Sequence, residues 1–360
     1  MKYFLITILI YSSLSAQSVI LKGNISKAPV NTTSPAVKKA LQSQPPFPSN
    51  PEPLEWYSST TLVDQQVAPN VYFAFDINTE KRMMQNKHNM STTMYVIGKK
   101  GVLVADTQPT KRVNEELLEL IREKTSLPIL YIVNTTPQGD HHYGNMFFPK
   151  ETKIIQHEET AKMIMSPEIF AENKAFISTL ADPKDLEEII PREADILITK
   201  QNSTLKIDLG EKIIEVKHFG GLQNEGDLFV YLPQDNVIFT GNNGYTSYPA
   251  FGGPWLFRGN INQYISSFEN LLKFIPKDAM ILPGHGVPTS VKIMDINLKY
   301  LKDFKLKVEK AYKSKVSVDN AVLDITKEME KEYGGFATYK MFQDLNIRSF
   351  YEAQNKKKIE

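Results

Sequence analysis

Short runs rich in β-branched residues recur from residue 70 onward, and this rhythm constrains the fold more than any other feature of the chain. Such runs predict strands at 71–75, 94–97, 102–105, 129–133, 153–156, 196–199, 205–209, 213–217, 228–232, 237–240 and 280–282. Stretches with helical periodicity cover 113–124, 261–274 and about 291–333. The turn at 233–236 predicts a hairpin between the two strands that flank it. Two β-rich halves, each closed by helices, predict an α/β (α+β) chain that folds as a sandwich.

The composition excludes several kinds of chemistry. The 360 residues include no cysteine, so disulfides, thiolate nucleophiles and cysteine-based metal sites are excluded. A metal ion would have to use histidine, carboxylate or amide ligands, and the chain has only six histidines. The formal net charge of +1 gives no sign of a nucleic-acid or anionic-membrane partner. We therefore expect a small-molecule partner, and nothing in the composition indicates an oligomeric state.

The N-terminal residues have the layout of a secretory signal peptide. Lys2 precedes an apolar run over 4–11, which is followed by small residues up to Ala16. We expect a signal peptide over 1–16 and an exported protein, periplasmic or secreted; the alternative is a buried N-terminal strand. The apolar run is shorter than the roughly 20 residues that span a bilayer, and no cysteine follows it for lipidation, so no membrane anchor is expected.

The rest of the chain divides into three predicted parts. Repeated prolines over 17–55 predict a linker or a surface arm in which neither helix nor strand runs far. The β-rich pattern places the main domain at 56–290. The helical stretch and the basic end make 291–360 a C-terminal helical extension, which we expect to pack on the same domain.

Polar residues that can bind a metal follow the predicted strand at 129–133. Residues 134–145 read NTTPQGDHHYGN, and they come where α/β sheets usually place ligands, beyond the carboxyl edge. Asp140 and His141 on such a tight loop could both bind one ion. In the alternative interpretation, Asp140 caps the next helix while His141 and His142 are solvated.

Two further segments carry candidate residues. His285 lies between two glycines at the end of the strand at 280–282, where the backbone can come close to a ligand. Residues 218–227 read HFGGLQNEGD and precede the hairpin, which ends in FTGN at 239–242. Each segment alone is a weak signal, but the order of the three segments along the chain is specific.

In this order the segments resemble the metallo-β-lactamase-fold superfamily, over roughly residues 70–352. Such proteins carry HxHxDH after a strand, a histidine in a GHTxGD-like element, an Asp after FTG, and then PGH. The phrases VADT at 104–107, HEE at 157–159 and DLFVYLP at 227–233 also look like the family. The resemblance implies a four-layer αββα sandwich with a two-metal site at one edge, followed here by the C-terminal helical extension.

The ligand positions of that family are only partly filled here. Four of them carry neutral residues in place of the family's ligands: Thr136, Gln138, Gln223 and Asn242. The surviving ligands are Asp140, His141 and His285, which correspond to the family's second metal site. The nearby side chains of His142, His218 and Glu225 are displaced from the lost positions, and we do not expect them to rebuild the first site.

The resemblance thus implies a single metal ion, zinc in the first place with iron or manganese as alternatives, held by Asp140, His141 and His285. Two imidazoles and one carboxylate leave a fourth coordination position open for chemistry. Asp140 is the candidate catalytic residue, because one carboxylate oxygen can bind the ion while the other orients a water. The aromatic segment at 243–255 supplies the candidate substrate contacts, unless it only covers the sheet edge; they are Tyr245, Tyr248 and Trp255.

Two functions of different kinds follow from this pattern. The first is an exported hydrolase that uses one metal ion to activate water against an ester, amide, lactam or thioester. The second is a catalytically inactive member of the fold that acts as a small-molecule or protein-binding module. A purely structural role is a third. The metal content of the protein separates the first two.

Overall fold

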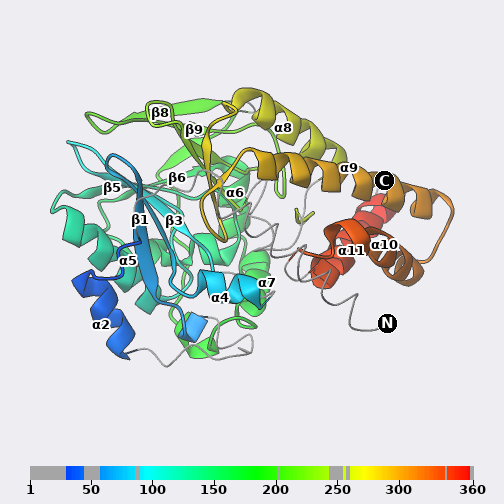
Figure 1. Cartoon of the computed structure of the whole chain (residues 1–360), viewed down its shortest axis with the longest axis horizontal. Helices are drawn as coiled ribbons and strands as arrows, with labels where there is room; N and C mark the ends of the chain where they lie inside the picture. Colours follow the sequence, from blue (N-terminus) through cyan, green and yellow to red (C-terminus); the bar gives the residue numbers. More distant parts are fainter. Residues whose placement is uncertain are drawn as a thin grey trace, which may run out of the picture.

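The computed structural model describes residues 30–43, 57–85, 90–200, 203–242, 254–256, 260–336 and 339–356. Its strands form two sheets, and helices cover the outer faces of both (Figure 1). Every strand and helix that the sequence predicts is present.

The first sheet has seven strands in chain order: β1 (Leu62–Ala68), β2 (Val71–Asp76), β3 (Thr93–Ile97), β4 (Val102–Ala105), β5 (Ile129–Val133), β6 (Lys153–His157) and β7 (Ile196–Ile198). β1 to β4 pair antiparallel, whereas β4 to β7 pair parallel. The carboxyl ends of β4 and β5 therefore meet at the same edge. The sequence analysis missed β1, because its polar centre at 64–66 hides the apolar pattern. Asp64 is nevertheless buried, where it accepts a hydrogen bond from Tyr95.

The second sheet has six strands in the order β13 (Thr289–Ser290), β12 (Met280–Pro283), β11 (Val237–Gly241), β10 (Phe229–Leu232), β9 (Ile213–Lys217) and β8 (Thr204–Asp208). β10 and β11 pair antiparallel around the turn at 233–236, which confirms the predicted hairpin. β11 and β12 pair parallel, so that Gly241 lies beside Pro283 at their carboxyl ends.

Alternate residues of the second sheet face two different layers. Val230, Phe239 and Leu282 belong to the core shared with the first sheet. Their neighbours Phe229, Ile238 and Ile281 belong to the core shared with helices. This alternation, with a period of two, places the sheet between the first sheet and a helical layer. The predicted four-layer αββα sandwich is confirmed.

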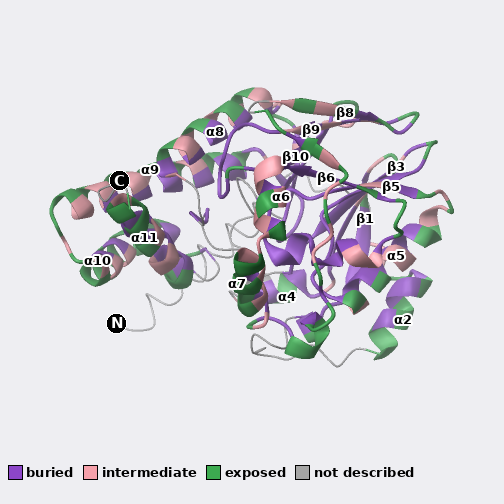
Figure 2. Ribbon diagram, turned by 180° about the vertical axis from the view of Figure 1, so that it is seen from behind, coloured by how far each residue is buried: buried purple, intermediate pink, exposed green. Residues whose placement is uncertain are grey.

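The helices form the two outer layers and the C-terminal extension. They are α2 (Pro35–Ser43), α4 (Thr79–Met84), α5 (Lys111–Lys124), α6 (Glu158–Met165), α7 (Pro167–Ile177), α8 (Ile261–Phe274), α9 (Lys292–Lys313), α10 (Val318–Tyr333) and α11 (Tyr339–Lys356), with the 3-10 turns η1 (Gly139–His141), η2 (Tyr143–Phe147) and η3 (Pro183–Leu186). The central strands are mostly buried, whereas the covering helices carry buried and exposed residues in alternation (Figure 2). α10 and α11 lie at the opposite end of the molecule from α2 (Figure 1).

The N-terminal predictions meet the structure only in part. The expected signal peptide at 1–16 lies outside the described residues. Within the expected linker at 17–55, in which no long helix was expected, residues 35–43 form the nine-residue helix α2. The helix begins with Pro35, which suits a first helical turn, and Val37 enters the core. The Ala36 N–H donates to Glu123 of α5 over 2.7 Å. In the described part of the chain, no helix has the length and apolar character needed to span a bilayer.

Candidate metal centre

The loop that follows β5 is anchored by a carboxylate at the end of the neighbouring strand. Asp106 comes directly after β4, and its N–H donates to the carbonyl of Val133 over 2.8 Å. Its backbone has a φ of +58°, an uncommon conformation for a residue other than glycine. The buried carboxylate accepts hydrogen bonds from the N–H and the hydroxyl of Thr135, both at 2.7 Å. Asp106 therefore holds the start of the 134–145 loop against the edge of the sheet.

The second sheet brings its own residue to this edge through the parallel pair β11 and β12. The N–H of Gly284 donates to the carbonyl of Gly241 over 2.7 Å. A Cβ at position 284 would lie 2.4 Å from the carbonyl carbon of Gly241, so only glycine fits there. On the other side, the N–H of Thr92 donates to the carbonyl of Gly284 over 2.9 Å. His285 is thus fixed between the two sheets.

The two sheets touch where β11 and β5 end. Gly241 has a φ of +53°, and a Cβ on it would lie 1.8 Å from the hydroxyl of Thr135. Only glycine satisfies both conditions. The backbone of Gly241, which bonds to Gly284 beside His285, therefore lies against the side chain of Thr135 at the start of the loop that carries Asp140.

Asp140, His141 and His285 come together in a compact buried cluster. The Nε2 atoms of His141 and His285 are 3.3 Å apart. Oδ2 of Asp140 lies 3.4 Å from Nε2 of His285 and 3.7 Å from Nε2 of His141. A tetrahedral zinc ion with bonds of about 2.0–2.1 Å places its ligand atoms about 3.3–3.4 Å apart, so the three donors fit such an ion. Within the described ranges this is the one group of three or more His, Asp or Glu side chains with metal-binding spacing.

Asp106 also determines which nitrogen of His141 faces the cluster. Its Oδ2 lies 2.9 Å from Nδ1 of His141, so Nδ1 carries a proton and Nε2 points at Asp140 and His285. Burial lowers the pKa of His141, but the carboxylates of Asp140 and Asp106 outweigh burial and raise it above its usual value. The same two carboxylates would stabilise a cation held at this place.

The alternative role of Asp140 as a helix cap is wrong. η1 begins after Gln138 and η2 after His142, and neither turn has a side-chain capping hydrogen bond. The carboxylate of Asp140 is directed at the imidazoles instead. His141 and His142 are not solvated either, because both are buried.

Three of the four substituted positions form a neutral hydrogen-bonded chain, and the fourth, Thr136, bonds to Asn224. Nε2 of Gln138 donates to Oε1 of Gln223 over 3.1 Å, and Nε2 of Gln223 donates to the backbone carbonyl of Asn242 over 2.6 Å. The hydroxyl of Thr136 accepts from Asn224 over 3.3 Å. Amides that are bonded to one another offer no charge to compensate a second cation.

The side chains considered as replacement ligands are engaged elsewhere. The ring of His142 packs edge-on against Tyr143, with the ring centroids 4.9 Å apart, and burial lowers its pKa to about 3. His218 stacks on His157 with centroids 4.2 Å apart. Glu225 accepts a hydrogen bond from Gln263 over 2.7 Å. The structure brings none of the three into the cluster formed by Asp140 and its two histidines.

A cavity of about 130 Å³ opens onto the cluster. It is lined by Gln138, Gly139, Asp140, Glu172, Asn173, Phe176, Ile177, Leu180, Asn242, Trp255 and His285. Of the predicted substrate contacts, Trp255 is in its wall, whereas Tyr245 and Tyr248 lie outside the described residues. The sequence analysis missed the contribution of α7, whose Asn173 donates to the carbonyl of Pro137 over 3.1 Å. Only Asn173 and Ile177 of this helix are buried, so its sequence lacks a clear apolar stripe.

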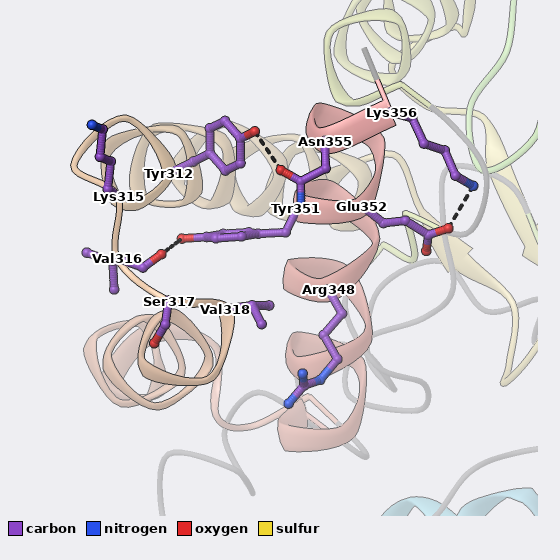
Figure 3. Close-up of a pocket in the computed structure, with 10 residues that line it drawn as sticks. All are labelled: Tyr312, Lys315, Val316, Ser317, Val318, Arg348, Tyr351, Glu352, Asn355 and Lys356. Carbon is purple, nitrogen blue, oxygen red and sulfur yellow. Dashed lines mark hydrogen bonds and ion pairs between the residues drawn. The ribbon is translucent and has the colours of Figure 1, made fainter. Parts of the chain in front are cut away.

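A second cavity, of about 640 Å³, lies among the C-terminal helices α9, α10 and α11 (Figure 3). Most of the charged side chains in its wall are already paired. Arg348 contacts Asp319 and Asp344, each at 2.9 Å, and Lys356 contacts Glu352 at 2.7 Å. None of the cluster residues lines this cavity.

Comparisons with known proteins agree with this architecture. No protein-family model matches the chain. Among solved structures, the chain is similar to a metallo-β-lactamase from Pontibacter korlensis, with a TM-score of 0.52 and 20% identity over 67% of this chain and 99% of that one. The DIM-1 metallo-β-lactamase gives a TM-score of 0.50 and 20% identity over 67% of this chain and 97% of that one. A stereoselective inverting sec-alkylsulfatase, Pisa1 from Pseudomonas sp., gives a TM-score of 0.60 and 16% identity over 82% of this chain, which spans 50% of that protein's length. The two sheets, their covering helices and these likenesses show that the chain has the metallo-β-lactamase fold.

Proposed function

We propose that this protein is a hydrolase that uses a single metal ion, zinc in the first place, held by Asp140, His141 and His285. The observation that carries the proposal is the spacing of the three donor atoms, 3.3, 3.4 and 3.7 Å, in a buried cluster. Asp106 behind His141 supports it, because metal-binding histidines usually donate their other N–H to a carboxylate. The proposed substrates are esters, amides, lactams and thioesters.

Each residue of the centre has a distinct proposed role. When bound, the metal supplies Lewis acidity and lowers the pKa of a water at its open position. The carboxylate of Asp140 orients the attacking water through its second oxygen and accepts the proton released in the attack. Asp106 keeps His141 in the tautomer that presents Nε2. The apolar wall of the cavity, which includes Ile177 and Trp255, limits the access of bulk water.

A measurement of metal content tests this proposal. We expect purified protein, produced without metal-affinity purification, to contain about one equivalent of zinc, iron or manganese. His285→Ala and Asp140→Asn should each lose that metal, because each removes one of three ligands. His142→Phe is the matched control: it removes a buried imidazole next to the cluster, keeps the ring contact with Tyr143, and should retain the metal. A folded wild-type protein without stoichiometric metal would refute the hydrolase proposal.

The hydrogen-bonded amides at the first metal position favour a second candidate function, that of an inactive member of the fold that binds a small molecule or a protein. A module of this kind needs no ion, so it predicts no metal or only a loosely held one. The metal analysis above therefore decides between the two.

Export remains part of the proposal because of the charge, apolar run and small residues over 1–16. Mass spectrometry of the protein recovered from its native cells should find an N-terminus near residue 17. An intact Met1 in the cell interior would contradict export.

A further inference from the structure

Two buried acceptor atoms lie next to the candidate metal centre without a donor. Oε1 of Gln138 and Oδ1 of Asn242 receive no hydrogen bond from the residues that the structure describes. Gln138 is 5% exposed and Asn242 is 2% exposed, so bulk water does not readily solvate these atoms. Buried polar atoms without a partner are uncommon and costly, which points to a ligand that supplies the donor. Both residues line the 130 Å³ cavity.

The orientation of the Gln138 amide follows from the hydrogen-bonded chain. The backbone carbonyl of Asn242 can only accept, so Gln223 must direct its Nε2 toward it. Oε1 of Gln223 is therefore left to accept from Nε2 of Gln138. The remaining atom of the Gln138 amide is the oxygen, and it cannot be exchanged for the nitrogen without breaking the chain. Gln138, which lines the cavity, thus has a fixed acceptor.

The rest of the lining restricts what can bind. Phe176, Ile177, Leu180 and Trp255 form an apolar side. Among the described residues that line the cavity, none is lysine or arginine, whereas Asp140 and Glu172 are acidic. An anionic ligand group would meet no cationic side chain there, while a neutral donor would find two acceptors.

We propose that Gln138 and Asn242 form a recognition subsite for a neutral N–H donor, and that the substrate is a compact amide or lactam with a free N–H and an apolar body. This inference rests on the proposed hydrolase function and narrows its substrate class. Esters and thioesters carry no donor at the reacting group, so they leave both acceptors unpaired. An amide or lactam places its N–H on one of these acceptors, with its apolar part against Trp255 and its carbonyl toward the cluster.

Two small probes that differ only in the donor test the subsite. δ-Valerolactam has a free N–H, and its N-methyl derivative has none. Their affinities are measured by NMR titration of the full mature chain, both with zinc and after removal of metal by EDTA. We expect the free lactam to bind at least about fivefold more tightly than the N-methyl compound. It should also shift the indole N–H signal of Trp255, which a Trp255→Phe variant assigns.

Two substitutions at one position separate the acceptor from the shape of the side chain. Gln138→Met keeps the length but removes the oxygen together with the Nε2 that donates to Gln223, so the preference should fall below about twofold. Gln138→Glu keeps an acceptor oxygen, and in its neutral form its O–H replaces Nε2 as the donor to Gln223, so it should keep the preference for the N–H probe. Equal binding of the two probes, binding of neither, or an unchanged preference in Gln138→Met overturns the inference.

The same experiment separates the two proposals. A preference for the N–H probe that persists after EDTA, in a protein without stoichiometric metal, supports the subsite and refutes the hydrolase. If zinc is bound and depends on Asp140, His141 and His285, but the protein shows no preference for the N–H probe, the hydrolase proposal is supported and the subsite is refuted.

Discussion

Asp106 acts on the candidate metal centre from behind, through one histidine. It touches no other cluster residue in the hydrogen bonds described above; it bonds to Nδ1 of His141 and to Thr135. A carboxylate in this place can only accept from the ring, which fixes the proton on Nδ1 and leaves Nε2 for a metal. An amide in its place could donate as well as accept, and would no longer fix the tautomer.

We therefore expect Asp106→Asn to weaken zinc binding about tenfold to a hundredfold without removing a ligand. Competition with a chromophoric chelator measures this affinity. Asp64→Asn is a suitable control, because it alters another buried carboxylate, bonded to Tyr95 and Lys124, far along the sheet from His141. An unchanged zinc affinity in Asp106→Asn would show that the tautomer is fixed by something else.

At this scale, the sequence predicted which residues lie in the cluster but not what the substituted ligands do. Asp140, His141 and His285 could be grouped because the order of their segments resembles that of the metallo-β-lactamase-fold superfamily. The bond between Gln138 and Gln223 joins residues 85 positions apart, and it depends on amide orientation. No local pattern encodes such a contact, so the sequence showed only that charge had been lost there.

Two of the elements that the sequence missed, α2 and β1, offer few apolar residues from which to read a period. α2 is short and lies among prolines, and only three of its residues are buried: Ala36, Val37 and Ala40. β1 has polar residues at its centre, and their burial depends on partners in other elements, such as Lys124 of α5 with Asp64. The strands of the two cores were predicted correctly, because there the apolar residues follow the period of the element. Periodicity thus identified the sandwich but not α7, the helix that lines the cavity.

The start of α6 depends on a histidine that must stay neutral. The ring of His157 accepts the N–H of Glu159 over 3.2 Å, so it acts as the N-cap of the helix. It also stacks on His218 with ring centroids 4.2 Å apart. Burial lowers the pKa of His157 to about 4, and His218 and Lys162 act in the same direction, whereas Glu159 opposes them. A protonated ring could not accept the capping hydrogen bond.

This arrangement predicts a loss of stability in acid. A histidine whose pKa is lower in the folded state contributes stability that is complete above its unfolded pKa of about 6.5, and that is lost as the pH falls through the folded value near 4. His157→Asn keeps a capping acceptor and removes the titrating group. When the pH is lowered from 7 to 4.5, the free energy of unfolding measured in urea should fall by about 1–2 kcal/mol more in wild type than in the variant. The same pH dependence in both proteins would contradict the role of His157.

At the scale of the whole molecule, the C-terminal helices hold one wall of the cavity. Asn346 of α11 is buried, and its side chain bonds to the N–H of Leu256 at 2.7 Å, the carbonyl of Pro254 at 2.9 Å and the hydroxyl of Tyr300 at 3.0 Å. Trp255, between these two backbone contacts, packs its ring against Phe342 of α11 with centroids 5.6 Å apart. The extension is therefore joined to the site and does not only cover the second sheet.

Asn346→Leu tests this connection, because it keeps the number and branching of the side-chain heavy atoms and removes the hydrogen bonds. We expect the free energy of unfolding to fall by about 2–4 kcal/mol, since several buried backbone and hydroxyl groups lose their partner. In a Trp56→Phe background, where Trp255 is the only tryptophan, acrylamide quenching should rise about twofold as the ring is released. Zinc content should not change, because Asp140, His141 and His285 are held by the strand ends.

Asn355→Leu provides the matched control on the same helix. Asn355 is exposed and bonds only to the hydroxyl of Tyr312 among the contacts described, at 2.9 Å. Its loss should leave both the quenching of Trp255 and the affinity for δ-valerolactam as in wild type. If Asn346→Leu loses stability while Trp255 stays protected, the helices support the fold but do not shape the cavity. If quenching rises and lactam binding weakens together, the C-terminal extension contributes to substrate recognition through Trp255.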